Sequence, residues 1–153
     1  MPTAIVTLQE TRISIAKFVL YLMGVPVSWR SKGMKSVTLS SAEADYVALS
    51  EAAKEVKYVH QLLMSMDVEV KLPIVVRVNN IGAIFMSNNV AVLQRTKHVD
   101  IRYHFVHEFV LDGFLKVVFV KTEDNDADIF TKNLNGELYA HHAKKMVMKK
   151  EMN

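Results

Sequence analysis

The chain has 153 residues, half of them hydrophobic, which suffices for one core of ordinary size but not for two, so we expect a single domain over residues 1–153. Its 19 Lys and Arg against 16 Asp and Glu give a net charge of +3, a mild basic bias that is compatible with a polyanionic partner. The absence of cysteine excludes a disulfide framework and a cysteine-based zinc site, and the longest apolar stretch, residues 18–29, is too short to span a bilayer; we expect an intracellular protein with no membrane partner.

The first third of the chain has the pattern of three strands. Apolar and β-branched residues run from 4 to 8, from 13 to 23 and from 25 to 31. Gly24 and Pro26 mark the turn between the last two runs, which predicts a hairpin.

Residues 40–66 are expected to form the longest helix of the chain. Apolar residues from Leu49 to Leu63 recur in this segment at helical spacing. Ser40 with Glu43 three positions later has the capping-box pattern, which predicts that the helix starts there.

The second half of the chain alternates between strands and helices. The β-branched run at 72–78 predicts a central strand buried on both faces, and a short helix from about Ile81 to Met86 should follow it. A helix within 97–113 that ends at Gly113, a strand at 114–122, a short acidic helix start and a basic C-terminal helix complete the order. This order predicts an α/β fold in which helices pack on the faces of a mixed sheet.

Three positions could carry chemistry. Asp45 lies near the start of the long helix, Asn79 closes the central strand, and Asp128 begins the last acidic turn. Ligands of such sheets usually sit at the C-terminal edge of the central strand, and carboxylates there could hold Mg²⁺ for phosphate chemistry. The helix dipole explains Asp45 equally well, and a cap or a solvated acid explains Asp128.

Four collinear blocks resemble the RNase H domain that ends copia-type retrotransposon polyproteins. The segment SWRSKGMKSVTLSSAEADYVALSEAAKEVKYVHQLL is similar to the family's SWKSKKQ…SSTEAEYMALSEA…WL. The segments VRVNNIGAI, RTKHVDIRYHFVHE and VKTEDNDADIFTKNL are similar to CDNQSAI, RTKHIDIRYHFIRE and VPTEDQLADILTKPL. The resemblance implies an RNase H-like fold, with a five-stranded mixed sheet and helices on both faces. It also implies hydrolysis of the RNA strand of an RNA:DNA hybrid by water activated between two Mg²⁺ ions.

Under this resemblance, only two of the family's four acidic ligands correspond to an acidic residue in this chain. The first belongs to a DxDWAG strand, and Pro2 and Ala4 stand where its aspartates would fall, so the first strand is substituted and its formation is left open. The second and fourth ligands correspond to Asp45 and Asp128, and the third to Asn79. An amide adds no charge to offset two Mg²⁺ ions, so we expect weakened Mg²⁺ binding and little or no nuclease activity.

A second group of residues could contact nucleic acid. Basic groups beside an aromatic ring can hold a sugar-phosphate backbone, so we expect weak binding of an RNA:DNA hybrid or another nucleic acid. The alternative is a solvated loop and a tryptophan in the core. The candidates are Trp29, Arg30, Lys32, Lys35, Lys97, His98 and Arg102.

Two other functions stay open. One is slow hybrid cleavage through Asp45 and Asp128, with Asn79 or Glu43 standing in as a ligand. The other is a scaffold that makes protein contacts only. Metal-dependent cleavage would identify the first, and hybrid binding that weakens steeply with salt would exclude the second.

Overall fold

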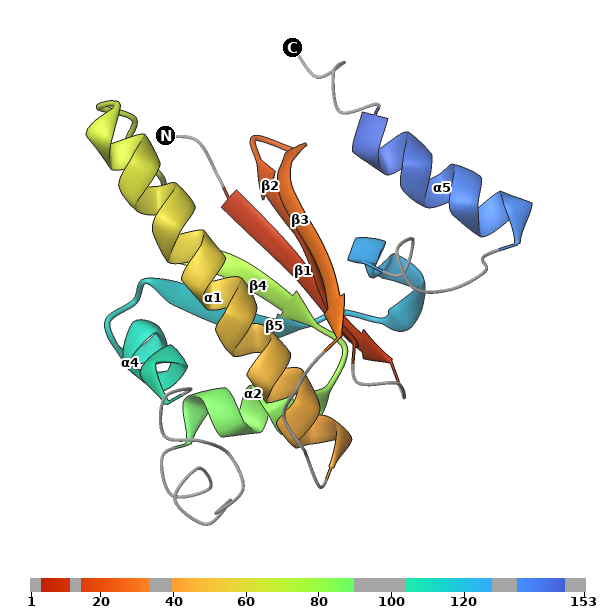
Figure 1. Cartoon of the computed structure of the whole chain (residues 1–153), viewed down its shortest axis with the longest axis horizontal. Coiled ribbons are helices and arrows are strands. Elements are labelled where there is room, and N and C mark those ends of the chain that lie inside the picture. Colours follow the sequence, from red (N-terminus) through yellow and green to blue (C-terminus); the bar gives the residue numbers. More distant parts are fainter. Residues whose placement is uncertain (1–3, 12–14, 34–39, 90–103, 128–134, 148–153) are drawn as a thin grey trace.

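The computed structural model of the chain describes residues 4–11, 15–33, 40–89, 104–127 and 135–147 (Figure 1). In chain order these residues form β1 (Ala4–Thr11), β2 (Ile15–Leu22), β3 (Val25–Gly33), α1 (Ser41–Ser65), β4 (Ile74–Val78), α2 (Ile81–Asn88), α4 (Phe105–Leu111), β5 (Leu115–Phe119), the 3₁₀ turn η2 (Thr122–Asp124) and α5 (Gly136–Val147). No helix among these residues is long and apolar enough to cross a membrane.

One mixed sheet contains the five strands in the order β3-β2-β1-β4-β5. The first three strands are antiparallel, whereas β1 is parallel to β4 and β4 to β5. The predicted α/β class is confirmed. The substituted first strand forms and lies at the centre of the sheet, because Ile5–Leu8 pair with Val75–Val78 while the whole of β1 pairs with β2.

A tight turn joins β2 to β3 and confirms the predicted hairpin. Met23 and Gly24 both have positive φ, 52° and 80°, which is the backbone that a two-residue hairpin turn requires. Pro26 lies inside β3 rather than in the turn, next to an irregularity in the pairing of Leu20 and Tyr21. Proline is tolerated there because β3 is an edge strand.

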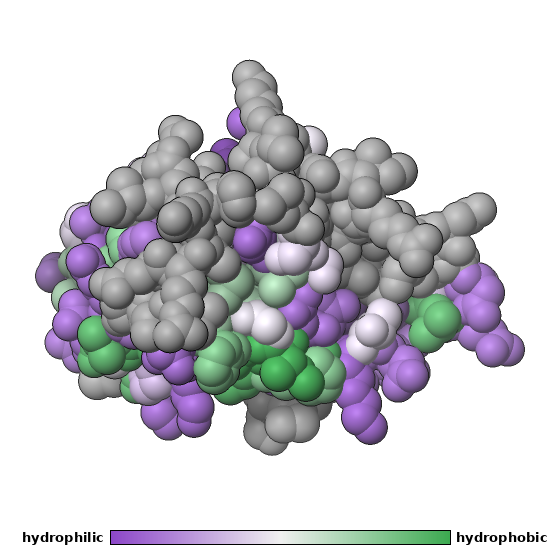
Figure 2. All heavy atoms as spheres, turned by 90° about the horizontal axis from the view of Figure 1, so that it is seen from below, coloured by the Kyte–Doolittle hydropathy of each residue, from purple (hydrophilic) through white to green (hydrophobic). Residues whose placement is uncertain are grey.

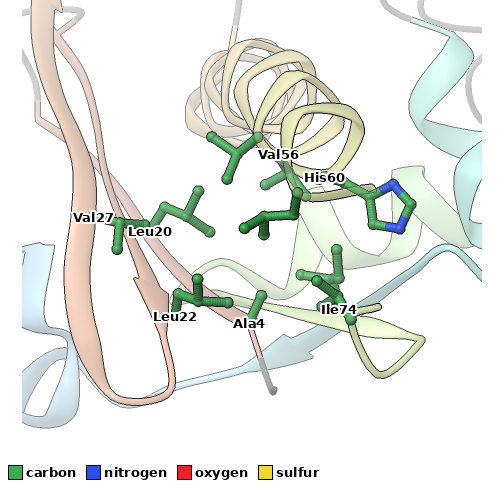
Figure 3. A pocket seen from close by; sticks show the side chains of 10 residues that line it. Ala4, Leu20, Leu22, Val27, Val56, His60 and Ile74 are labelled. Atoms are coloured by element: carbon green, nitrogen blue, oxygen red, sulfur yellow. The ribbon is translucent and has the colours of Figure 1, made fainter. Parts of the chain in front are cut away.

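Helix α1 covers one face of the sheet and begins where the sequence predicts. The Ser40 hydroxyl accepts a hydrogen bond from the Glu43 backbone N–H at 3.2 Å, which caps the helix. Figure 3 shows side chains of α1 and of the strands meeting around a small apolar cavity, with Val56 and Leu20 facing each other. Burial, followed by the charge of Lys57, lowers the pKa of His60, whose ring lies at the edge of this cavity.

The other face of the sheet is less completely covered. On β4, Ile74, Val76 and Val78 are buried toward α1, but Val75 and Arg77 are only half-buried. The prediction of a strand buried on both faces is therefore correct for one face only. The difference follows from the limited cover on this side, where α5 contacts β3 at the edge of the sheet.

The later helices agree with the predicted order where the structure describes them. Helix α4 is followed by Gly113 at φ 70°, and the Phe114 N–H donates to the Phe109 carbonyl at 2.9 Å, so the predicted glycine stop is confirmed. The acidic segment after β5 begins with the 3₁₀ turn η2. Residues 97–103 and 148–150 of the predicted helices lie outside the described part of the chain.

A buried polar pair fixes α5 to the rest of the protein. His142 is 1% exposed, and its Nδ1 lies 3.0 Å from Oδ1 of the buried Asp126. Burial, followed by the charge of Asp126, raises the pKa of Tyr21, which places this β2 side chain in the same cluster. Loss of one partner would leave the other buried without its hydrogen bond.

We expect His142→Ala to lower the free energy of unfolding by about 3 kcal/mol, because it removes a buried imidazole and the hydrogen bond between this ring and Asp126. Urea unfolding of the purified protein measures the change. His141→Ala is the matched control, since His141 is the exposed neighbour on the same helix and should cost less than about 0.5 kcal/mol. Equal losses in the two variants would contradict the role of the pair.

Candidate functional site

The first turn of α1 meets the end of β4 and the start of α2, and two of the three predicted site residues meet there. Asp45 is 5% exposed near the beginning of α1, and Asn79 is half-buried directly after the last residue of β4. Asn80 follows as the N-cap of α2, and its Nδ2 donates a hydrogen bond to Asp45 Oδ2 at 2.8 Å. The third predicted residue, Asp128, lies outside the described residues.

The side-chain amide of Asn80 makes two different contacts at its two ends. Its Oδ1 accepts hydrogen bonds from the backbone N–H groups of Gly82 at 2.9 Å and of Ala83 at 3.3 Å. These contacts fix the orientation of the amide, so that the NH₂ group necessarily faces Asp45. A carboxylate could cap α2 equally well but could not donate to Asp45. The amino-acid sequence alone did not predict this contact between Asn80 and Asp45.

A close approach of the two helices accompanies this contact. A Cβ added to Gly82 would lie 2.7 Å from the Ala42 Cβ and 3.1 Å from Asn80 Oδ1, so no side chain fits at this position without a shift. The corresponding positions in the family segments SSTEAEY and CDNQSAI are threonine and serine. The small residues Ala42 and Gly82 therefore permit a helix contact for which those larger side chains leave no room.

The register of the first strand determines which residue lies beside Asn79. Leu8 pairs with Val78, so the next residues along the two parallel strands are Gln9 and Asn79. Ala4 lies four residues before Leu8, which is about 13 Å away along the strand. The structure therefore does not bring Ala4, at which the resemblance places an aspartate of the family motif, next to Asn79.

Among the described residues, the side chains at this junction that could coordinate a metal ion do not fit a two-metal centre. They comprise one carboxylate, Asp45, whose Oδ2 is bonded to Asn80, and the neutral side chains of Asn79 and Asn80. Glu43 is buried two residues earlier, and its backbone is part of the helix cap. Among the described residues, no group of three His, Asp or Glu side chains could hold a metal ion. A pair of Mg²⁺ ions needs several carboxylates to offset four positive charges, and this part of the chain does not supply them.

The predicted basic patch is divided between two faces of the sheet. Trp29 is 62% exposed, so the alternative of a core tryptophan is wrong. Ser28 donates a hydrogen bond to Glu55 of α1 at 2.9 Å, and the alternation of a strand places Arg30 and Lys32 on that side and Trp29 on the other. The remaining candidates lie outside the described residues: Lys35, Lys97, His98 and Arg102.

Comparison with known proteins relates the chain to one segment of much longer polyproteins. It is 34% identical over 138 residues to the retrovirus-related Pol polyprotein from transposon RE1 of Arabidopsis thaliana, a match that covers 90% of this chain and 9% of that protein. It is 37% identical over 123 residues to the retrovirus-related Pol polyprotein from transposon TNT 1-94 of Nicotiana tabacum, a match that covers 80% of this chain and 9% of that protein. The chain thus spans about 9% of the length of these curated relatives.

A shorter match joins the chain to a different kind of protein. Over 46 residues it is 50% identical to the secreted RxLR effector protein 161 of Plasmopara viticola, covering 30% of this chain and 32% of that protein. No family model matches the chain. The similarity over most of the chain is therefore to retrotransposon Pol polyproteins.

We expect Asn80→Asp to destabilise the protein by about 2 kcal/mol at neutral pH, because it replaces the donor to Asp45 by a second carboxylate. Urea unfolding tests this. The helix dipole alone would instead make the Asn80→Asp variant more stable, since an acid at the N-terminus of a helix is favourable. The control is Asn88→Asp at the other end of α2, which should cost less than about 1 kcal/mol. Greater stability of Asn80→Asp than of the wild type would disprove the structural importance of this contact.

We expect Gly82→Ala to lower the free energy of unfolding by about 2 kcal/mol, because its methyl group collides with Ala42. A double-mutant cycle with Ala42→Gly should give a favourable coupling of about 1 kcal/mol, since removing the Ala42 Cβ makes room for the new methyl group. Gly33→Ala is the control, because a Cβ at Gly33 meets nothing within 4 Å. Additive effects of the two substitutions would show that the helices do not approach each other this closely.

Proposed function

We propose that the chain is an RNase H-like domain derived from a retrotransposon Pol polyprotein, in which two-metal hydrolysis of RNA:DNA hybrids is lost. Similarity to the Pol polyproteins of transposons RE1 and TNT 1-94 supports the origin. The observation that carries the loss of activity is the neutral Asn79 directly after β4, where the family segment CDNQSAI has its aspartate.

Electrostatics supports this proposal. Two catalytic Mg²⁺ ions would place four positive charges at the end of β4, where the neutral Asn79 contributes no negative charge to offset them. Mg²⁺ bound through Asp45 and Asp128 would therefore be weak, and much of the preorganised field on which catalysis depends would be missing.

Weak affinity for nucleic acid is the second part of the proposal. The net charge of +3 and the exposed Arg30 and Lys32 favour contact with a phosphate backbone. The expected partner is an RNA:DNA hybrid, bound mainly by charge and without cleavage.

A module for protein contacts is a second candidate, which one observation favours. Ile81 and Phe85, one turn apart on α2 and next to Asn80, are 70% and 55% exposed. Figure 2 shows hydrophobic residues gathered in a limited area of one face, between hydrophilic residues. Apolar side chains exposed beside a former active site would suit a protein surface better than a nucleic acid.

Incubation of the purified chain with a labelled RNA:DNA hybrid and Mg²⁺ tests the proposed function. We expect no metal-dependent cleavage, together with binding whose affinity falls as salt is raised. Cleavage that needs Mg²⁺ and disappears in Asp128→Ala would refute the loss of activity. Absence of hybrid binding at low salt, together with unchanged folding, would favour the module for protein contacts.

A further inference from the structure

A groove of about 410 Å³ lies between α1 and α4, away from the Asp45–Asn80 contact. Lys54, Lys57, Tyr58 and Gln61 line it from α1, at a spacing of three, four and seven residues that places them on one stripe of the helix. Phe105 and Phe109 line it from α4, one turn apart. Lys54 lies nine residues beyond Asp45, about 14 Å along the helix axis, so the groove is a separate feature.

Aromatic rings form the α4 wall of this groove. Phe105 and Phe109 pack edge to face at 5.3 Å between ring centroids, and Phe109 packs in the same way on Phe114 at 5.2 Å. The ammonium group of Lys57 lies 4.6 Å from the Phe114 centroid and 5.5 Å from the Phe109 centroid. Cation–π contacts therefore hold a positive charge against the apolar wall. Across the groove on α1, the Tyr58 side chain is 64% exposed and can cover one face of an inserted planar group.

The charge of the lining is positive. Lys54 pairs with Glu51 at 2.7 Å, but both side chains are partly exposed, and such surface pairs contribute little stability, so that an anion can compete for this lysine. Burial and the neighbouring Lys57 lower the pKa of His60, which lines the separate apolar cavity and not this groove. The cationic groups of the lining are thus Lys54 and Lys57.

We propose that this groove binds a nucleotide unit of single-stranded nucleic acid, with the phosphate on Lys54 and Lys57 and the base between Tyr58 and the phenylalanine wall. Planar bases stack on aromatic side chains whatever their sequence, and the lysines complement the phosphate charge. An acidic peptide could use the same lysines but would leave the rings without a planar partner. The inference goes beyond the proposed function, because it concerns a surface that does not include Asp45 or Asn79.

The test is fluorescence anisotropy of a labelled oligothymidylate about twelve nucleotides long, titrated at several salt concentrations without Mg²⁺. We expect Tyr58→Ala to weaken binding about tenfold without changing the salt dependence, because it removes stacking only. We expect Lys54→Gln to make the slope of log K against log salt less steep by about 0.7, because it removes one phosphate contact. Both residues are exposed, so neither variant should unfold the protein.

Matched controls are Tyr139→Ala and Lys71→Gln, which alter an exposed tyrosine and an exposed lysine outside the groove and should leave binding unchanged. Binding of deoxythymidine monophosphate alone, weakened by Tyr58→Ala, would support the same chemistry with a free nucleotide as its source. Equal losses in the controls, or no binding of the oligonucleotide at low salt, would overturn the proposal. So would an acidic peptide that binds in the groove while the oligonucleotide does not. Because no cleavage is measured, these outcomes are independent of the hybrid assay.

Discussion

A single amide joins the N-termini of α1 and α2, and the arrangement of the site depends on it. Asn80 accepts from Gly82 and Ala83 with its oxygen and donates to Asp45 with its nitrogen. Asparagine has both functions in one short side chain, whereas aspartate could only accept. The missing side chain of Gly82 lets α2 approach Ala42, so packing and hydrogen bonding support the same geometry.

This arrangement changes the electrostatics of the junction. A cluster of carboxylates at the end of a central strand repels itself and is stabilised when cations bind. Here the buried carboxylate of Asp45 is compensated by an uncharged donor and by the N-terminus of its own helix, while Asn79 is neutral. With Asn79 in place of a second carboxylate, the junction carries less negative charge to offset Mg²⁺, which is the basis of the proposed loss of catalysis.

Local features of the fold were predictable because their causes are local. The Ser40 cap, the turn at Met23 and Gly24 and the end of α4 before Gly113 depend on residues a few positions apart. The buried pair of Asp126 and His142 was not predictable, because it joins segments that no periodic pattern connects. The contact of His107 Nδ1 with the Ser87 carbonyl at 3.0 Å, which ties α4 to α2, was missed for the same reason.

The amino-acid sequence by itself determined the α/β class, the hairpin and the long helix, because these follow from residue type and spacing, whereas an acid at the position of Asn79 is implied only by the resemblance to the RNase H domain. Only the tertiary structure decided that Asn80 binds Asp45, that Gln9 rather than Ala4 is the residue level with Asn79, and that Trp29 lies apart from Arg30. The physical reason is that strand register and the approach of two helices depend on how distant segments pack, and the pattern of one segment does not contain that information.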